Sequence, residues 1–531
     1  MVTEAPAAGL SDDATTTRRR AAELVARGVV VVAAAVPLVI FLWVALRQLG
    51  YPYELEWMEG GSVEVAARVY HGQSIYVAPS LHYVPYAYTP LYYWVSGTLA
   101  HLTGIGFLPL RLVSLVASLG CFALLFAMVR RETRDAVAGF LAAGLFAATY
   151  EVGGAWLNIG RVDSLFLCLL LAALAVGRRA ERWPGALGCG LLFFAAFFTK
   201  QSGLLAAVPV LVLLVVTRRR VGLVASATLA GAVVVSTLVL DAATSGWYEW
   251  FVFGELVHQG TDYTTLHRFV ADDLLRPVGF AVLLALGGLA VGLWRRRTPT
   301  DWAYWGLAAA GMAGSALVSR LHSGGARDTL IPLYAAVALL AALGYDAFRR
   351  SELGPATVVG GALALVVALQ VGVRVDHPSH LIPTPSDTAA GRHLIARIAA
   401  TPGQVLVLDH PWYETMAGKP SFAQGEAVHD VLRAGPSRAR TLLEASIRQV
   451  MATPKVTTVY LDDLGEENML GMTRPGSGWV RGGRVFSCFR CFFPPTDVAL
   501  RPALRYERAP SPTSLGESVP GLTSVPSARG H

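Results

Sequence analysis

One stretch of the chain, residues 51–93, concentrates acidic and aromatic side chains between two long apolar runs. Its chemically versatile residues are Glu54, Glu56, Glu59 and Glu64, accompanied by Trp57 and several tyrosines. Carboxylates accept protons or bind cations, and aromatic faces stack on sugar rings or lie at the headgroup level of a membrane. A solvated acidic loop beside an aromatic belt would have the same composition, so this stretch alone leaves catalysis and surface charge open.

The composition identifies the kind of protein that must position this stretch. Of the 531 residues, 54% are hydrophobic and only 15% are charged, whereas a soluble protein carries about 25% charged residues. Repeated apolar runs of about 18 residues or more indicate a polytopic helical membrane protein. The formal charge of +7 does not indicate nucleic-acid binding, because the arginines fall in short clusters between the apolar runs. This is the positive-inside pattern of a plasma-membrane protein.

The arginine clusters assign a side of the membrane to each run. Three arginines at 18–20 predict that residues 1–21 form a cytoplasmic tail. We expect spans at about 22–47, 107–129, 135–150, 160–177, 185–199, 204–217, 221–242, a run ending at 295–297, 302–319, 329–347 and 355–373. Every cluster then lies inside, which predicts eleven spans and an extracytoplasmic C-terminus. The predicted membrane domain is 22–374, with an acidic outer loop at 48–106.

The run at 90–102 decides this topology. It is apolar but too short to cross a bilayer. If it crossed, the next span would carry Arg130, Arg131 and Arg134 to the outside. We therefore expect it to lie on the outer surface as an interfacial helix.

The composition becomes globular after residue 375. Short β-branched runs at 403–410 and 456–463 predict strands, and periodic segments at 386–400 and 437–452 predict helices. This alternation indicates an extracytoplasmic α/β domain over 375–507, and the Pro-, Ser- and Gly-rich residues 508–531 read as a disordered tail.

Two further groups in this domain were considered as sites. Cys488 and Cys491 form a C-x-x-C motif. It favours a local disulfide over a metal site, because a metal site would need a second pair of ligands. Asp409, His410 and His429 lack ligand-like spacing and are interpreted as surface residues, so no metal site is predicted.

Ionisable residues recur at the predicted outer ends of the spans. They are Arg161, Asp163, Lys200, Arg320, His322, Arg327 and Asp328. Each cation taken singly could be a snorkelling side chain, but snorkelling cations should concentrate on the cytoplasmic side here. Ionisable groups within a membrane domain are candidates for function. Cations on the side that holds the acidic loop would suit a phosphate-bearing lipid donor and a hydroxyl acceptor.

Together these residues resemble the C-type glycosyltransferases, in the branch that holds protein O-mannosyltransferases and aminoarabinose transferases. That branch has an acidic pair in its first outer loop, then G-x-x-x-Y and a Pro-Leu-Tyr-Tyr juxtamembrane helix. An Arg–Asp element, a T-K-x-x-x-L turn and an Arg ahead of an L-x-P-L-Y-A-like segment follow. The matching residues are Glu56 and Glu59, Gly72 and Tyr76, Pro90 to Tyr93, Arg161 and Asp163, Thr199, Lys200 and Leu204, and Arg327 with Ile331, Pro332 and Leu333. One position departs, because Met58 occupies the place of the family's usual Asp and leaves Glu56 as the displaced acid.

The resemblance implies an inverting transfer of a sugar, hexose or pentose, from a polyprenyl-phosphate donor to a hydroxyl acceptor. Glu56 or Glu59 would be the general base, and Lys200 and Arg327 would hold the donor phosphate. Tyr88, Tyr92, Tyr93, Arg161, Asp163 and His322 are the expected substrate-binding residues, although interfacial anchoring competes for the tyrosines. No cofactor is required by this chemistry, and a divalent metal stays open.

Two other functions remain alternatives at this point. A secondary transporter would place ionisable residues near mid-bilayer on broken helices with a repeated half, and the sequence shows no such features. A non-catalytic envelope-assembly protein would not require the outer acids and cations.

Overall fold

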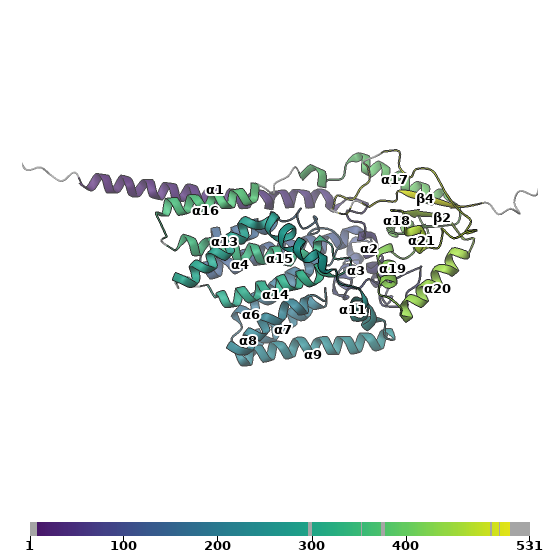
Figure 1. Ribbon diagram of the computed structural model, residues 1–531, viewed down its shortest axis with the longest axis horizontal. Helices are drawn as coiled ribbons and strands as arrows, with labels where there is room; N and C mark the ends of the chain where they lie inside the picture. Colours follow the sequence, from purple (N-terminus) through teal and green to yellow (C-terminus); the bar gives the residue numbers. More distant parts are fainter. Residues whose placement is uncertain are drawn as a thin grey trace, which may run out of the picture.

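The chain folds into a helical bundle that carries a small sheet-containing domain at one end (Figure 1). The computed structural model describes residues 8–295, 300–351, 353–372, 378–488, 491–496, 498 and 500–509. Each of the eleven predicted spans coincides with a helix. They are α1 (Ala8–Leu49), α4 (Phe107–Thr133), α5 (Ala136–Ala147), α6 (Asp163–Arg179), α7 (Trp183–Phe197), α8 (Gly203–Thr217), α9 (Arg219–Thr244), α13 (Arg276–Arg295), α14 (Trp302–Leu321), α15 (Ile331–Arg349) and α16 (Ala356–Gly372).

By length and composition, five helices in the described part of the chain are apolar enough to cross a membrane, and four shorter ones are also apolar. α15 is the central helix, because it is buried along most of its length against α13, α14 and α5. α9 is peripheral and exposes large aliphatic side chains such as Val235 and Leu238. Such a surface suits lipid and not water. The predicted fold class, a multi-pass helical membrane protein with a C-terminal α/β domain, is confirmed.

The arginine clusters meet at one end of the bundle. Arg178, in the last turn of α6, pairs with Glu132 in the last turn of α4 at 2.8 Å. Arg218, between α8 and α9, donates to the carbonyl of Ala180 after α6 at 2.9 Å. The clusters therefore share a side, as the alternation of spans requires. Arg296 and Arg297, from another cluster, lie outside the described residues.

Two short helices cover the opposite end of the bundle. α3 (Leu91–Thr103) is the predicted interfacial helix, and its 13 residues are too few to cross a bilayer. α2 (Glu59–Tyr70) was not predicted, and it begins at one of the candidate acids. Both helices pack against each other and against α4.

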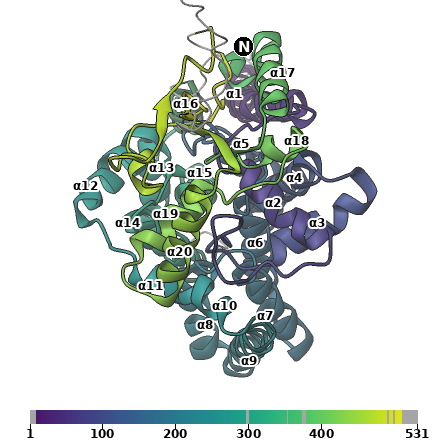
Figure 2. The same cartoon turned by 90° about the vertical axis from the view of Figure 1, so that its right-hand side faces the viewer.

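The C-terminal domain is built on a four-stranded mixed sheet in the order β1-β2-β4-β3. β1 (Gln404–Val407) and β2 (Val456–Leu461), the two predicted strands, pair in parallel, and β4 (Leu504–Arg508) pairs antiparallel with β2 and with β3 (Trp479–Arg481). The helices are α17 (Pro385–Ala400), α18 (Trp412–Met416), α19 (Gly425–Arg433), α20 (Arg438–Ala452) and α21 (Glu466–Met469). Figure 2 shows this domain lying over the end of the bundle that carries α2 and α3. Of the predicted tail, residues 510–531 lie outside the described part of the chain, and Arg508 belongs to β4.

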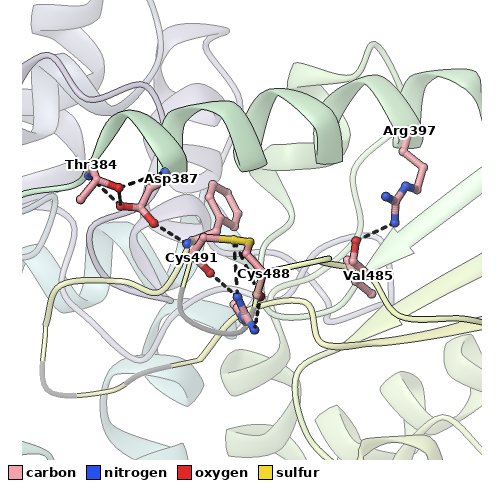
Figure 3. Close-up of a disulfide and its surroundings, with 8 residues drawn as sticks. Thr384, Asp387, Arg397, Val485, Cys488 and Cys491 are labelled. Carbon is pink, nitrogen blue, oxygen red and sulfur yellow. Dashed lines mark hydrogen bonds between the residues drawn. A yellow bond between two sulfur atoms is a disulfide. The ribbon is translucent and has the colours of Figure 1, made fainter.

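A disulfide between Cys488 and Cys491 ties the segment after β3 into a tight loop against α17 (Figure 3). The loop is held by Asp387, which accepts a 2.6 Å hydrogen bond from the Phe492 amide. Asp387 also completes a capping box with Thr384 at the start of α17, so one carboxylate serves the helix terminus and the loop.

The predicted sidedness leads to a labelling experiment. Gln73, Ser386 and Thr217 are all exposed, the first two beyond the end of the bundle that carries α2 and the third at the arginine end. Gln73→Cys and Ser386→Cys should react with a membrane-impermeant maleimide in intact cells, and Thr217→Cys should react only after permeabilisation. The unsubstituted protein gives the background, and labelling of Thr217→Cys in intact cells would contradict the topology.

Candidate active site

The two candidate acids lie three residues apart in very different surroundings. Glu59 is fully buried in the first turn of α2 and forms a bidentate pair with Arg111 of α4, with Nε–Oε1 at 2.8 Å and Nη2–Oε2 at 2.7 Å. Its oxygens also accept hydrogen bonds from the amides of Leu55 at 2.8 Å and Gly160 at 2.7 Å. Four donors satisfy this carboxylate, which suits a structural clamp better than a proton acceptor.

Glu56 is equally buried but incompletely paired. Its Oε2 accepts a 3.1 Å hydrogen bond from the Met58 amide and lies 3.7 Å from Nη1 of Arg161. Its Oε1 has no hydrogen-bond partner among the described residues. Burial raises the pKa of this carboxyl to about 8, and Arg161 opposes the shift. The carboxylate of Glu56 thus lies against the backbone of Met58, the residue at which the resemblance expects an acid.

Tyr88 connects the acid to the predicted phosphate-binding lysine. Its hydroxyl accepts a 3.1 Å hydrogen bond from Nη2 of Arg161, and its ring centroid lies 6.0 Å from Nζ of Lys200. The G-x-x-x-Y motif positions it, because Gly72 turns the chain with φ +68° and the Tyr76 hydroxyl donates to the Tyr88 carbonyl at 2.6 Å.

Lys200 lies in the turn between α7 and α8, and two carboxylates surround its ammonium. Nζ is 2.6 Å from Oδ1 of Asp163, at the start of α6, and 3.1 Å from Oδ2 of Asp328, just before α15. The lysine is buried and is no snorkelling side chain at the surface. The three residues join the beginnings of α6, α8 and α15. Asp328 was noticed in the sequence but was not among the predicted site residues.

The other predicted site residues are Arg327, Tyr92, Tyr93 and His322, and they have different surroundings. Arg327 is exposed and precedes Asp328 in the short helix η4 (Arg327–Leu330). Tyr92 and Tyr93 are buried, and the Tyr92 hydroxyl donates to the Leu110 carbonyl at 3.0 Å, so both are packing residues in this arrangement. His322 lies 3.3 Å from the carbonyl of Leu256, on a neighbouring outer segment.

Residues that sequence reasoning missed surround the acids. Arg111 lies near the start of a predicted span, and a lone arginine in an apolar run is a signal that could have identified it. Asp409 and His410 were interpreted as surface residues, which is wrong, because both are buried, whereas His429 is exposed as expected. His410 contacts Glu54 of the acidic loop. The described residues contain no cluster of three or more His, Cys, Asp or Glu side chains that could hold a metal ion.

The contrast between the acids gives a stability prediction for Glu59. Glu59→Gln leaves the buried Arg111 charge without its carboxylate, which should cost on the order of 3–5 kcal/mol. Thermal unfolding in detergent should show a marked fall in Tm. Glu64→Gln is the matched control on the same helix, since the hydrogen bonds that Glu64 accepts within the described part of the chain come from the neutral hydroxyls of Thr415 and Ser421. Equal Tm values for the two variants would contradict the clamp.

Comparisons with known proteins give a sequence match over part of the chain and a shared fold. Residues 86–244 match the family model of dolichyl-phosphate-mannose-protein mannosyltransferases. Two similar solved structures are those of ArnT from Cupriavidus metallidurans. The form bound to undecaprenyl phosphate has TM-score 0.55 and 17% identity, over 84% of this chain and 95% of ArnT. The apo form has TM-score 0.54 and 16% identity, over the same shares of both chains.

A search of curated proteins finds no significant sequence match. The family match covers the segment that holds Tyr88, Arg161, Asp163 and Lys200, and the fold is shared over most of the chain. The chain is therefore similar over residues 86–244 to dolichyl-phosphate-mannose-protein mannosyltransferases and shares the fold of ArnT over most of its length, in agreement with the resemblance to C-type glycosyltransferases that the sequence indicates.

Proposed function

We propose that this membrane protein transfers a sugar from a polyprenyl-phosphate donor to a hydroxyl acceptor at the outer face of the membrane, with inversion, and that Glu56 is the general base. The observation that carries the proposal is the buried Glu56 oxygen, which has no hydrogen-bond partner among the described residues and belongs to a carboxylate 3.7 Å from the Arg161 guanidinium. A solved structure of similar fold, ArnT, binds undecaprenyl phosphate, which supports a lipid-linked donor here.

In the proposed reaction the acceptor hydroxyl gives its proton to Glu56 as its oxygen attacks the anomeric carbon. The bond between that carbon and the phosphate oxygen breaks, and the phosphate leaves with the electron pair. One displacement by one nucleophile inverts the anomeric centre. Glu59 is not suited to the proton transfer, because both of its oxygens are occupied by Arg111 and backbone amides.

The leaving phosphate gains negative charge as the bond breaks and needs nearby cations. Arg161 contacts Glu56 and Tyr88, and Nζ of Lys200 lies 6.0 Å from the centroid of the Tyr88 ring. Arg327 directly precedes Asp328, whose carboxylate contacts Lys200. These three cations form the proposed phosphate group, with Asp163 holding the lysine in place and Tyr88 lining the space between them.

A base cannot be replaced by its amide, which has nearly the same size but takes no proton. Glu56→Gln should lower the transfer rate about 10²–10⁴-fold. Protein level and Tm should change much less than in Glu59→Gln, because the 3.7 Å contact of Glu56 with Arg161 is longer than the bidentate pair of Glu59 with Arg111, and donor binding should be preserved. Transfer of a radiolabelled sugar from the lipid donor in proteoliposomes measures the effect. Unchanged transfer, also in the Glu56→Gln/Glu59→Gln protein, would refute catalysis by this loop.

The buried position of Glu56 also predicts a pH dependence. The base acts only when deprotonated, and burial raises its pKa to about 8. The rate should therefore be full above this pH and fall as the pH is lowered through it. A profile of kcat/KM between pH 6 and pH 10 should show one acidic limb near this value, whereas an ordinary exposed glutamate would place the limb near pH 4.

A further inference from the structure

The acidic loop is joined to the C-terminal domain through a buried histidine. One ring nitrogen of His410, Nδ1, contacts the Glu54 carboxylate, and the other, Nε2, lies 2.8 Å from Oδ2 of Asp462. All three side chains are at most 2% exposed. His410 follows β1 and Asp462 follows β2, whereas Glu54 lies 356 residues earlier than His410 in the chain.

A second observation shows that Glu54 is wedged against the helix that begins at Glu59. A Cβ atom on Gly60 would lie 2.0 Å from Oε1 of Glu54 and 3.2 Å from Cβ of Trp412. The carboxylate therefore occupies the space beside the first turn of α2, on the positive end of the helix dipole. The backbone amide of Glu54 donates a 3.3 Å hydrogen bond to the Tyr413 hydroxyl, which also holds the main chain at this position.

Glu54 and Glu59 are thus fixed on either side of Glu56. Arg111 holds Glu59 from the membrane domain, and His410 holds Glu54 from the C-terminal domain. Between these two glutamates, at positions 55–58, the described structure has one ion pair, that of Glu56 with Arg161.

We infer that His410 is a positioning residue of the proposed reaction, and that the C-terminal domain uses it to fix the turn carrying the base. This inference rests on the proposed function. It makes the domain a part of the catalytic assembly, although the domain lends no group to the reacting atoms.

The charge of the histidine follows from the groups that face it. Glu54 comes from the acidic loop and Asp462 from the end of β2, and Asp409 precedes the histidine in the chain. Burial lowers the pKa of His410, but the two carboxylates outweigh burial and hold that pKa well above its usual range.

Other titratable groups lie close to this cluster. They are Tyr413, whose ring stacks on His410, Glu466 beside Asp409, and Tyr51 and Arg501, which line a small pocket together with Glu54 and His410. The cationic imidazole is the group that bridges the two carboxylates, so a neutral side chain cannot replace it.

The experiment compares His410→Gln, Glu54→Gln and their combination with the unsubstituted protein in the proteoliposome assay. Each single variant should lower kcat about 10²-fold, as expected for a displaced catalytic group, and leave the donor KM within about threefold. The double variant should lose no more than either single variant, because both break the same contact. Glu54→Gln should also shift the acidic limb of the profile to lower pH, since the Glu54 charge raises the pKa of Glu56.

Thr415→Ala is the matched control. Its hydroxyl donates to Glu64 at 2.9 Å across the same interface but does not touch the turn at 54–59. It should retain kcat. If His410→Gln does not fold, Gly60→Ala serves instead, because it pushes on Glu54 without removing a charge and should also lower kcat.

Unchanged kcat in the Glu54 variant, additive losses in the double variant, or an equal loss in Thr415→Ala would overturn the inference. Failure of the proposed base has a different signature. In that case Glu56→Gln would keep full transfer while the His410 and Glu54 variants still behaved as one coupled pair.

Discussion

The guanidinium of Arg111 is the constraint on which the outer end of the molecule depends. Besides both oxygens of Glu59, it donates to the carbonyls of Tyr51 at 2.5 Å and Tyr53 at 2.6 Å. The same glutamate accepts from the amide of Gly160. One side chain of α4 thereby fixes the exit of α1, the start of α2 and the approach to α6. A fully buried charge is tolerated there because all of its donors are used.

This constraint explains how two similar acids acquire different properties. Both oxygens of Glu59 are occupied by hydrogen-bond donors, whereas Glu56 is buried with one oxygen unpaired among the described residues. Environments that separate two neighbouring carboxyl groups in this way are typical of acid–base sites. The difference arises from α4 and from the residues before α6, which lie far from the loop in sequence. The spacing of the two glutamates alone therefore did not decide between them.

The sequence was sufficient for those features that depend on local composition. Hydropathy and arginine clusters predicted eleven segments that each coincide with a helix, and the short length of the run at 90–102 predicted α3. The two glycines at 60 and 61 weaken the helical signal of α2, which explains why it was missed. His410 was misjudged because its partner, Glu54, lies at the other end of the chain, and a contact over that separation leaves no spacing pattern. Arg111 could have been found, since an arginine inside a predicted span needs a partner.

The charges around Lys200 indicate that the three cations of the proposed phosphate group, Arg161, Lys200 and Arg327, have different roles. One ammonium faces two carboxylates, Asp163 and Asp328, so a phosphate approaching this triad alone would meet net negative charge. The two arginines bring further positive charge, and the charge of Arg161, which faces Glu56, becomes unbalanced when Glu56 takes up the acceptor proton. Arginine also binds phosphate oxygens in pairs, which a lysine does not. We therefore expect Lys200 to hold the ends of three helices together, and the two arginines to stabilise most of the negative charge that develops on the leaving group.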